Sequence, residues 1–324
     1  MGMALCRDAP RGRLRCGSRR AERQTVPQWT DPARLWRAPV ARWTPRKRRT
    51  HTGELEARAN VRKLRPHSPL IRGFQMTHPT RVLLVVSEAS PFTAASGLGD
   101  LMRALPEKLQ DSGRYEMRIM MPRYGIISER RNRLHEVIRL SGAEFPVAGG
   151  KESLKVKVAS IPGIRLQVYF MENARFFKRK GTYTGRDGED YDDNAERALF
   201  FGRAALTTIR NLGWSPDIVH AAGWAAALVP YLVAEEYRGD DLLGGARSIY
   251  TPDGHDALVP VDPALLAIDS GATPDLSTAL TLRSIAERYS VGTIFEPAPP
   301  VDPDDLYVAE AMGRYDEIQP LREG

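Results

Sequence analysis

An apolar run, a glycine turn and an amphipathic helix follow one another in residues 81–109, and they constrain the fold more than any other stretch. Val82 to Val86 is continuously apolar, which is typical of a strand covered on both faces. Leucines then recur at helical spacing through Leu101, Leu105 and Leu109. The sequence therefore predicts an α/β fold whose core is a single, doubly wound, mainly parallel sheet.

The turn between this strand and helix permits two interpretations. Gly97 and Gly99 allow close approach of a ligand to the backbone, and the start of a helix attracts an anion such as a nucleotide phosphate. Alternatively, the turn is only a tight connection, and Asp100 caps the helix. The residues of the turn do not choose between the two.

Charge divides the chain into two parts. Residues 1–75 hold 17 Arg and 2 Lys against 5 acids, and since the whole chain has a net charge of +7, residues 76–324 have a net charge of −7. Cys6 and Cys16 both lie in the basic part, so the rest has no disulfide framework, which fits a cytoplasmic protein. We predict a basic segment, residues 1–75, and one large domain, residues 76–324.

The basic segment has three interpretations. Trp29, Trp36 and Trp43 alternate with arginines, as in proteins that stack on single-stranded nucleic acid. An Arg-rich transit peptide would also lack acids, but it would hold more serine. We favour a disordered segment or an over-extended start, because Met76 directly precedes the first strand, and we expect neither a nucleic acid partner nor a membrane span.

The elements after the first helix alternate between two patterns. Residues 116–121 predict a second parallel strand. Three segments with period-two alternation then predict an antiparallel excursion, with a turn at Pro162-Gly163 between the last two. These segments are residues 137–145, 154–161 and 165–170.

Further elements complete a parallel sheet around a long polar loop, residues 171–193. A helix is predicted from Asn194 to Leu212, with Asp192 or Asp193 as its N-cap. We expect strands ending at His220 and near Thr251, on the same edge as the glycine turn, where open parallel sheets bind ligands. The remaining predicted elements are helices over 224–236, 281–289 and 306–314 and strands over 248–250 and 290–295.

Several blocks, in order, resemble bacterial glycogen synthases and plant starch synthases of the ADP-glucose type. They are VSEASPF, SGLGDLMRALPEKL, MPRYGII, DYDDNAERALFFGRAAL and LGWSPDIVHAAGWAAALVP. RNRLHEVIRLSG and VKVASIPGIRLQVYFMEN are similar to a short, single-domain group of synthase-like proteins. The resemblance covers about residues 81–250, with a weaker echo over 286–294. It identifies only the amino-terminal half of the family's catalytic region.

The resemblance implies a retaining transfer of glucose from ADP-glucose to an α-1,4-glucan, in a cleft between two Rossmann-like domains (the GT-B arrangement). The amino-terminal domain of that family holds the acceptor glucan, while the carboxy-terminal domain binds the nucleotide and supplies most of the cations. We therefore expect ADP-glucose as donor, a glycogen-like glucan as partner, no cofactor and no metal. A protein that supplies the other half of the cleft is a further expected partner.

Two departures from the family pattern put the chemistry in doubt. The family's loop lysine falls on Ala94, and residues 220–225 read His-Ala-Ala-Gly-Trp-Ala where the family has His-Ala-His-Asp-Trp-His. Glucosyl transfer develops charge on the leaving diphosphate and on the sugar, and losing one preorganised donor costs about 3 kcal/mol of transition-state stabilisation. We therefore expect no useful turnover by the chain alone.

The resemblance also supplies candidate site residues, each with a structural alternative. Asp193 matches the aspartate near the transferred sugar, but it would equally serve as an N-cap; His220 is a candidate catalyst, or a core histidine. The candidate residues for binding the nucleotide sugar or the glucan are Ser96, Gly97, Gly99, Asp100, Asn194, Arg197 and Trp224. Tyr183 and Tyr191 are weaker candidates. An acidic run, Glu189 to Asp193, suggests a divalent ion less readily than a solvated loop.

Two classes of function stay open. The first is a glycogen or starch synthase-type enzyme that obtains its nucleotide-binding half from another subunit. The second is a non-catalytic glucan-binding or regulatory module with a degenerate active site.

Overall fold

The computed structural model describes residues 78–94, 96–147, 150–164, 166–270, 280–296 and 303–318. The basic segment predicted from the charge distribution lies outside these residues. Within them, eight strands form one mixed sheet in the order β10-β9-β8-β1-β2-β7-β6-β3. Their bounds are β1 Thr80–Val86, β2 Tyr115–Pro122, β3 His135–Glu136, β6 Lys155–Ser160, β7 Gln167–Glu172, β8 Ile218–Ala222, β9 Arg247–Thr251 and β10 Gly292–Thr293.

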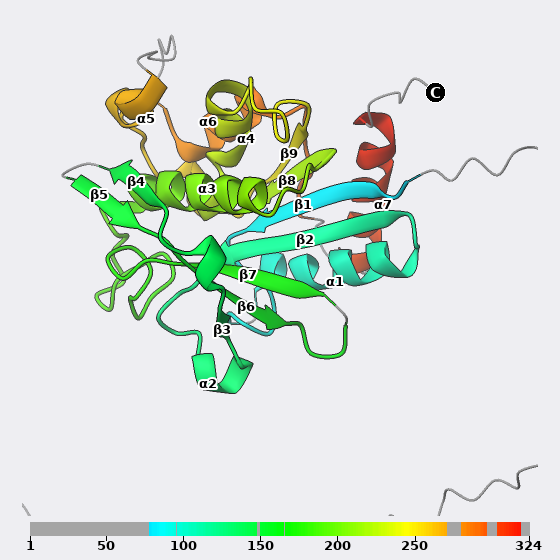
Figure 1. Cartoon of the computed structure of the whole chain (residues 1–324), viewed down its shortest axis with the longest axis horizontal. Helices are drawn as coiled ribbons and strands as arrows, with labels where there is room; N and C mark the ends of the chain where they lie inside the picture. Colours follow the sequence, from blue (N-terminus) through cyan, green and yellow to red (C-terminus); the bar gives the residue numbers. More distant parts are fainter. Residues whose placement is uncertain are drawn as a thin grey trace, which may run out of the picture. The chain divides into compact units, whose positions relative to one another are not determined.

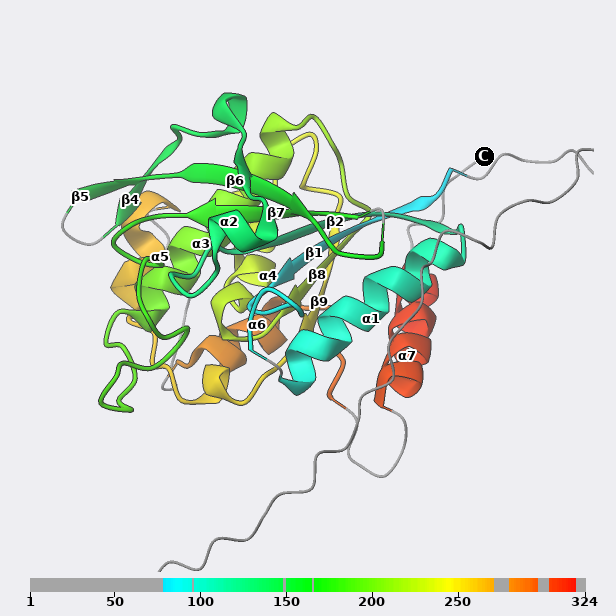
Figure 2. The same cartoon turned by 90° about the horizontal axis from the view of Figure 1, so that it is seen from below.

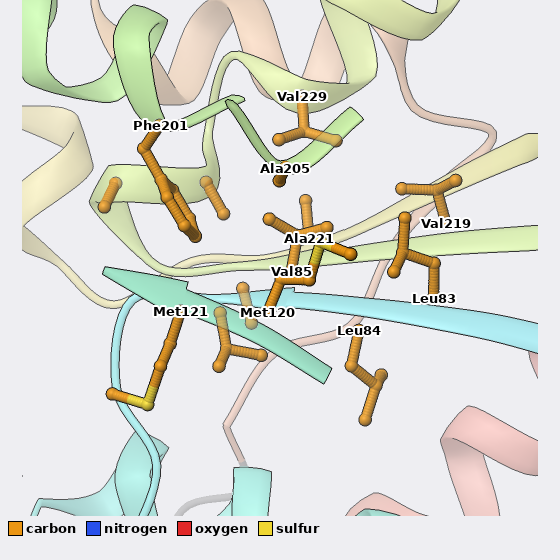
Figure 3. Close-up of a cluster of buried hydrophobic side chains, with 14 of the residues drawn as sticks. Leu83, Leu84, Val85, Met120, Met121, Phe201, Ala205, Val219, Ala221 and Val229 are labelled. Atoms are coloured by element: carbon orange, nitrogen blue, oxygen red, sulfur yellow. The ribbon is translucent and has the colours of Figure 1, made fainter. Parts of the chain in front are cut away.

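The six strands from β10 to β7 are parallel, which confirms the predicted fold class. β1 is central because its side chains are apolar toward both faces; consecutive residues point to opposite sides. Leu83 lies on the side of Phe201 and Val229, and Leu84 lies on the other (Figure 3). Val86 at the end of β1 is in register with Ala222 of β8, and Ala222 with Thr251 of β9, so these ends share one edge.

The antiparallel excursion is confirmed for two of its three segments. β6 and β7 pair antiparallel, from Lys155↔Glu172 to Ser160↔Gln167, across the predicted turn at Pro162 and Gly163. The strand predicted over 137–145 is wrong. The chain there forms a 3₁₀ turn (Ile138–Leu140) and then β4 (Glu144–Val147), which pairs with β5 (Gly150–Ser153) outside the main sheet.

The failed strand has a local cause. Gly142 adopts φ +95°, a left-handed conformation that turns the chain, and Ile138 is 83% exposed. Few backbone N–H groups of this stretch donate toward β6: Val137 N donates to Val156 O in the strand, and Gly142 N donates to Leu154 O just before it. Alternating apolar residues in a short segment do not make a strand when the turn chemistry directs the backbone elsewhere.

Helices cover both faces of the sheet (Figures 1 and 2). α1 (Gly97–Asp111) and α7 (Pro303–Ile318) pack together on one face, and α3 (Asn194–Asn211) and α4 (Val229–Tyr231) lie on the other. The shorter helices are α2 (Glu129–Asn132), α5 (Pro263–Ser270) and α6 (Leu282–Tyr289). None of the helices in the described part of the chain combines the length and the apolar character needed to span a bilayer.

The predicted helices lie where the sequence places them, but the bounds or the continuity of some of them differ from the prediction. α1, α3 and α6 occur where they are predicted, but the helix predicted over 224–236 is broken into a 3₁₀ turn, α4 and a π turn over Leu232–Glu236. Pro230 has no N–H to continue a helix and therefore stands at a helix start instead. α7 is longer than predicted, and the strand predicted over 290–295 shortens to β10.

Candidate functional site at the carboxyl edge of the sheet

The start of α1 lies at the edge of the sheet formed by the carboxyl ends of the parallel strands. Ser96, rather than Asp100, is the N-cap of this helix. The Ser96 hydroxyl accepts from Gly99 N at 2.9 Å and donates to the Glu88 carboxylate at 2.6 Å. Asp100 accepts a hydrogen bond from the Ser90 hydroxyl instead. The expectation that Asp100 caps the helix is therefore wrong, because Ser96 has the extended backbone of an N-cap and Asp100 is already inside the helix.

A hollow of about 480 Å³ lies beside the start of α1, but its charge is negative. Asp100, Glu107, Glu296 and Asp304 line it, with Arg103 as the cation. The Glu296 carboxylate lies against Gly97, where an added Cβ would collide with it. A carboxylate of the protein therefore lies at the helix start, where a phosphate was expected, and the surrounding acids disfavour a second anion.

The start of α3 supplies Asp193, which occupies the N-cap position without capping the helix through its side chain. Its backbone, at φ −95° and ψ 19°, is not in the extended conformation of a capping residue. Both carboxylate oxygens accept instead from Arg179, with Nη1 at 2.7 Å from Oδ1. This two-point ion pair holds the polar loop against the start of the helix.

Arg197, one turn into α3, is fully buried although it carries a charge. Its guanidinium donates to Phe176 O at 2.9 Å, Asn194 Oδ1 at 2.6 Å and Thr182 O at 2.7 Å. It also lies 4.8 Å from the centre of the Trp224 ring. Burial lowers the pKa of Arg197 to about 10. The positive charge is therefore held inside the protein and does not reach a ligand.

Tyr191 is the partly exposed aromatic ring above this cluster. Its ring centre is 4.6 Å from the guanidinium carbon of Arg179 and 5.0 Å from that of Arg197. The long loop is also tied to the turn after β9, since Tyr183 stacks on His255 with centroids 4.1 Å apart. Lys178 and Lys180 in the same loop are exposed, and the structure records no contact between them and Asp193.

The turns after β8 and β9 meet at Gly223, which adopts φ +79°. A Cβ there would lie 2.6 Å from Ser87 Oγ and 2.8 Å from Asp253 Oδ2, so only glycine fits. Trp224 N donates to Asp253 Oδ2 at 2.9 Å, and Ala225 N donates to Ser87 Oγ at 2.8 Å. Burial raises the pKa of Asp253 to about 6, against the opposing effect of the Trp224 N–H.

The sequence analysis missed Ser87, Asp253 and Arg179. The signal for the first two was present, because each polar residue directly follows, or nearly follows, a buried parallel strand at the ligand-binding edge. Arg179 gave no such signal, since its pairing with Asp193 depends on how the loop folds back on α3.

His220 lies in the core and not at the carboxyl edge. It pairs in register with Leu84 and Ile249, two residues before the end of β8, and its side chain is fully buried. Nδ1 lies 2.6 Å from the Tyr315 hydroxyl of α7, and Nε2 lies 2.9 Å from Thr251 Oγ1. Burial lowers the pKa of His220 to about 3. This is the core histidine of the alternative interpretation, and no surface faces it.

Two buried polar atoms close to this edge have no hydrogen-bond partner among the described residues, the Tyr124 hydroxyl and Trp224 Nε1. Tyr124 follows β2, whose end lies at the same edge, and burial raises the pKa of its hydroxyl. Trp224 follows β8 and packs edge-on against Tyr183, with ring centres 5.4 Å apart. Both residues are buried, so these atoms lie beneath the edge of the sheet rather than on its surface.

Two of the four acids in the acidic run of the loop have side-chain partners within the protein. Asp190 accepts from the Tyr183 hydroxyl at 3.0 Å, and Asp193 binds Arg179. Across the described part of the chain, no group of three or more His, Cys, Asp or Glu side chains is arranged to hold a metal ion.

Comparison with known proteins defines the class of this domain. Residues 81–252 match the model of the starch synthase catalytic domain family. The glycogen synthase of Chlorobium luteolum is 41% identical over 172 residues, which are 53% of this chain and 35% of that protein. That of Chlorobaculum parvum is 43% identical over 162 residues, 50% of this chain and 33% of that protein. The chain therefore spans about a third of the length of the curated relatives that it matches.

A solved structure agrees on the fold. The catalytic domain of starch synthase IV from Arabidopsis thaliana, bound to ADP and acarbose, matches with a TM-score of 0.56 at 21% identity. The match covers 74% of this chain and 50% of that one. The chain belongs to the starch synthase catalytic domain family of glycosyltransferases, and it matches the amino-terminal part of its relatives.

Proposed function

We propose that this domain binds an α-1,4-glucan such as glycogen and does not by itself transfer glucose to it from ADP-glucose. Its family catalyses that transfer, and the proposal is that this chain has kept the acceptor side of the reaction. The partly exposed Tyr191 would be the ring on which a sugar stacks. Arg197 packs beneath that ring and is itself held by Asn194 and Trp224, so these three buried residues would support the site without touching the sugar.

One observation supports the proposed lack of activity: Arg179 of the long loop and Arg197 of α3 both have their guanidinium donors engaged by protein acceptors. Arg179 neutralises Asp193, and Arg197 is fully buried on carbonyl and amide oxygens. A leaving diphosphate needs preorganised cations that are free to receive its charge. The acids around Gly97 work against that requirement.

Binding of purified full-length chain to glycogen tests the acceptor part. We expect the chain to sediment with glycogen, and Tyr191→Ala to weaken this binding on the order of tenfold, the loss expected when a stacking ring is removed. Tyr289→Ala is the matched control, because Tyr289 is also a partly exposed tyrosine in ring contact, with Tyr231 of α4, 5.1 Å away. Equal binding by wild type and Tyr191→Ala would remove the proposed stacking site.

A second candidate is an enzyme that obtains its nucleotide-binding half from another subunit. The retained Asp193 and Asn194 at the start of α3 favour it, because the resemblance places that aspartate near the transferred sugar. Adding a separately prepared carboxy-terminal half of a related glycogen synthase should then restore transfer to glycogen. No transfer by the mixture would leave the binding module as the better description.

A further inference from the structure

A second concave surface lies away from the start of α3, between α2, β3 and the turn from β6 to β7; we call it the α2 groove. Its volume is about 640 Å³. The polar and aromatic residues of its lining that matter here are Phe92, Arg131, Asn132, Arg133, His135 and Gln167. Figure 1 shows α2 and β3 together at the margin of the sheet, below β6. None of the residues of the proposed glucan site lines this groove.

The lining of the α2 groove contains no carboxylate among the described residues. Arg131, Arg133 and His135 are all exposed, and the structure records no ion pair for any of them. The neighbouring Glu129 is already bound by Arg123 and Lys157, both at 2.7 Å. This concentration of positive charge is unusual in a domain whose residues 76–324 carry a net charge of −7.

The remaining nearby acid, Glu136, follows His135 directly in β3. Successive residues of a strand point to opposite faces, so the Glu136 carboxylate is directed away from the face that His135 presents. The groove therefore keeps its positive charge, and an anion entering it meets cations on more than one element.

The backbone also carries strain at this surface. Arg133 ends α2 in a left-handed conformation, φ 52° and ψ 46°, and it is the one described residue other than glycine with positive φ. A residue other than glycine or asparagine is strained in that conformation, and such strain concentrates at ligand sites. The arginine therefore occupies a position that glycine or asparagine would fill at lower cost.

Groups suited to a carbohydrate accompany the cations. The side-chain amide of Asn132 donates to Ser128 O at 3.0 Å, and this hydrogen bond fixes the orientation of the amide. Gln167, at the start of β7, contributes a second amide. Phe92 forms an apolar floor and packs edge-on against Phe170, with ring centres 5.0 Å apart. Amides bind hydroxyl groups, an apolar ring faces a sugar, and guanidinium groups bind phosphate.

We propose that the α2 groove binds a phosphate ester of a carbohydrate, with the phosphate on Arg131, Arg133 and His135 and the sugar against Phe92. The source of the ester is either a small sugar phosphate or a phosphate group carried on a glucan chain. This site is separate from the proposed glucan site at α3 and does not depend on it.

Calorimetric titration of the full-length chain tests the proposal, with glucose 6-phosphate and phosphorylated maltodextrin as probes. We expect both Arg131→Gln and Arg133→Asn to weaken binding of the phosphorylated probe on the order of tenfold. Asparagine is chosen because it tolerates the left-handed conformation, so that the variant removes the charge without adding strain. Arg130→Gln is the matched control, since Arg130 belongs to the same helix and does not line the groove.

The arms of the experiment separate the outcomes. The 19 cations of residues 1–75 are the same in every variant, so a difference between variants reports the groove. A larger loss of binding in Arg131→Gln for the dextrin than for glucose 6-phosphate identifies a phosphorylated glucan as the source, and the reverse identifies a small sugar phosphate. Equal binding by Arg130→Gln and Arg131→Gln would overturn the proposal. So would binding of inorganic phosphate as tight as that of the esters.

Discussion

The arginines at the start of α3 and those in the α2 groove differ in what they bind. Arg179 and Arg197 each have protein acceptors for their donors, and Arg197 has no exposed surface. Arg131 and Arg133 are exposed and line a hollow without a carboxylate. A count of basic residues in the sequence would treat the two pairs alike. In the structure the donors of the first pair are engaged by the protein, whereas the second pair is exposed.

The two pairs of arginines therefore have different structural roles. Arg179 and Arg197 tie the long loop to the start of α3, which stabilises the fold. The Glu296 carboxylate at Gly97 adds a negative charge where the diphosphate was expected. Substitutions at three residues break or sharpen the comparison.

The largest effect is expected from Arg197→Met. Removing the guanidinium leaves Phe176 O, Thr182 O and Asn194 Oδ1 buried without their donor, which should lower the free energy of unfolding by about 3–5 kcal/mol. Urea denaturation measures it. Arg210→Met is the control, because its half-exposed pair with Asp240 is worth about 0–1 kcal/mol. Similar losses for both variants would show that Arg197 is not the structural cation described above.

His220 should act on stability through pH rather than on activity. Its pKa is about 3 in the folded state and about 6.5 when unfolded, so only the unfolded chain takes up the proton between these values. The free energy of unfolding should therefore fall as the pH drops from about 7 to 4, by about 3 kcal/mol from this residue.

The variant His220→Gln should lose that part of the pH dependence, as measured by denaturation at each pH. Thr251→Val is the control, because it removes the hydroxyl partner at Nε2 without removing a titrating group. An unchanged slope in His220→Gln would mean that the imidazole is accessible to protons in the folded state, contrary to its position under α7.

The smallest effect is expected at Asp193, and it separates the two interpretations of that residue. If Asp193 stabilises the protein through its ion pair with Arg179, Asp193→Asn and Asp193→Ala should both lower the free energy of unfolding by about 1 kcal/mol or less. The effect is small because both side chains are partly exposed. If it capped α3, asparagine would keep the cap and only alanine would lose about 1 kcal/mol. Thermal unfolding of the two variants side by side distinguishes these results.

Much of the sheet could be predicted because buried faces require apolar residues at a regular spacing in the sequence. The apolar runs of β1 and β8 and the helical period of α3 are each set by covered faces. The burial of His220 was one of the two predicted interpretations, but its partners could not be predicted, because α7 lies more than 80 residues further along the chain. Nor could the negative hollow at α1, since Glu296 and Asp304 reach it only through the fold.

Transfer of labelled glucose from ADP-glucose to glycogen, by the purified full-length chain, tests the central claim most directly. We predict no incorporation above the blank, in a preparation that still sediments with glycogen, while a full-length glycogen synthase incorporates label under the same conditions. Steady incorporation by this chain alone, abolished by Asp193→Ala, would contradict the account, because it would require free cations that the arginines at α3 do not provide.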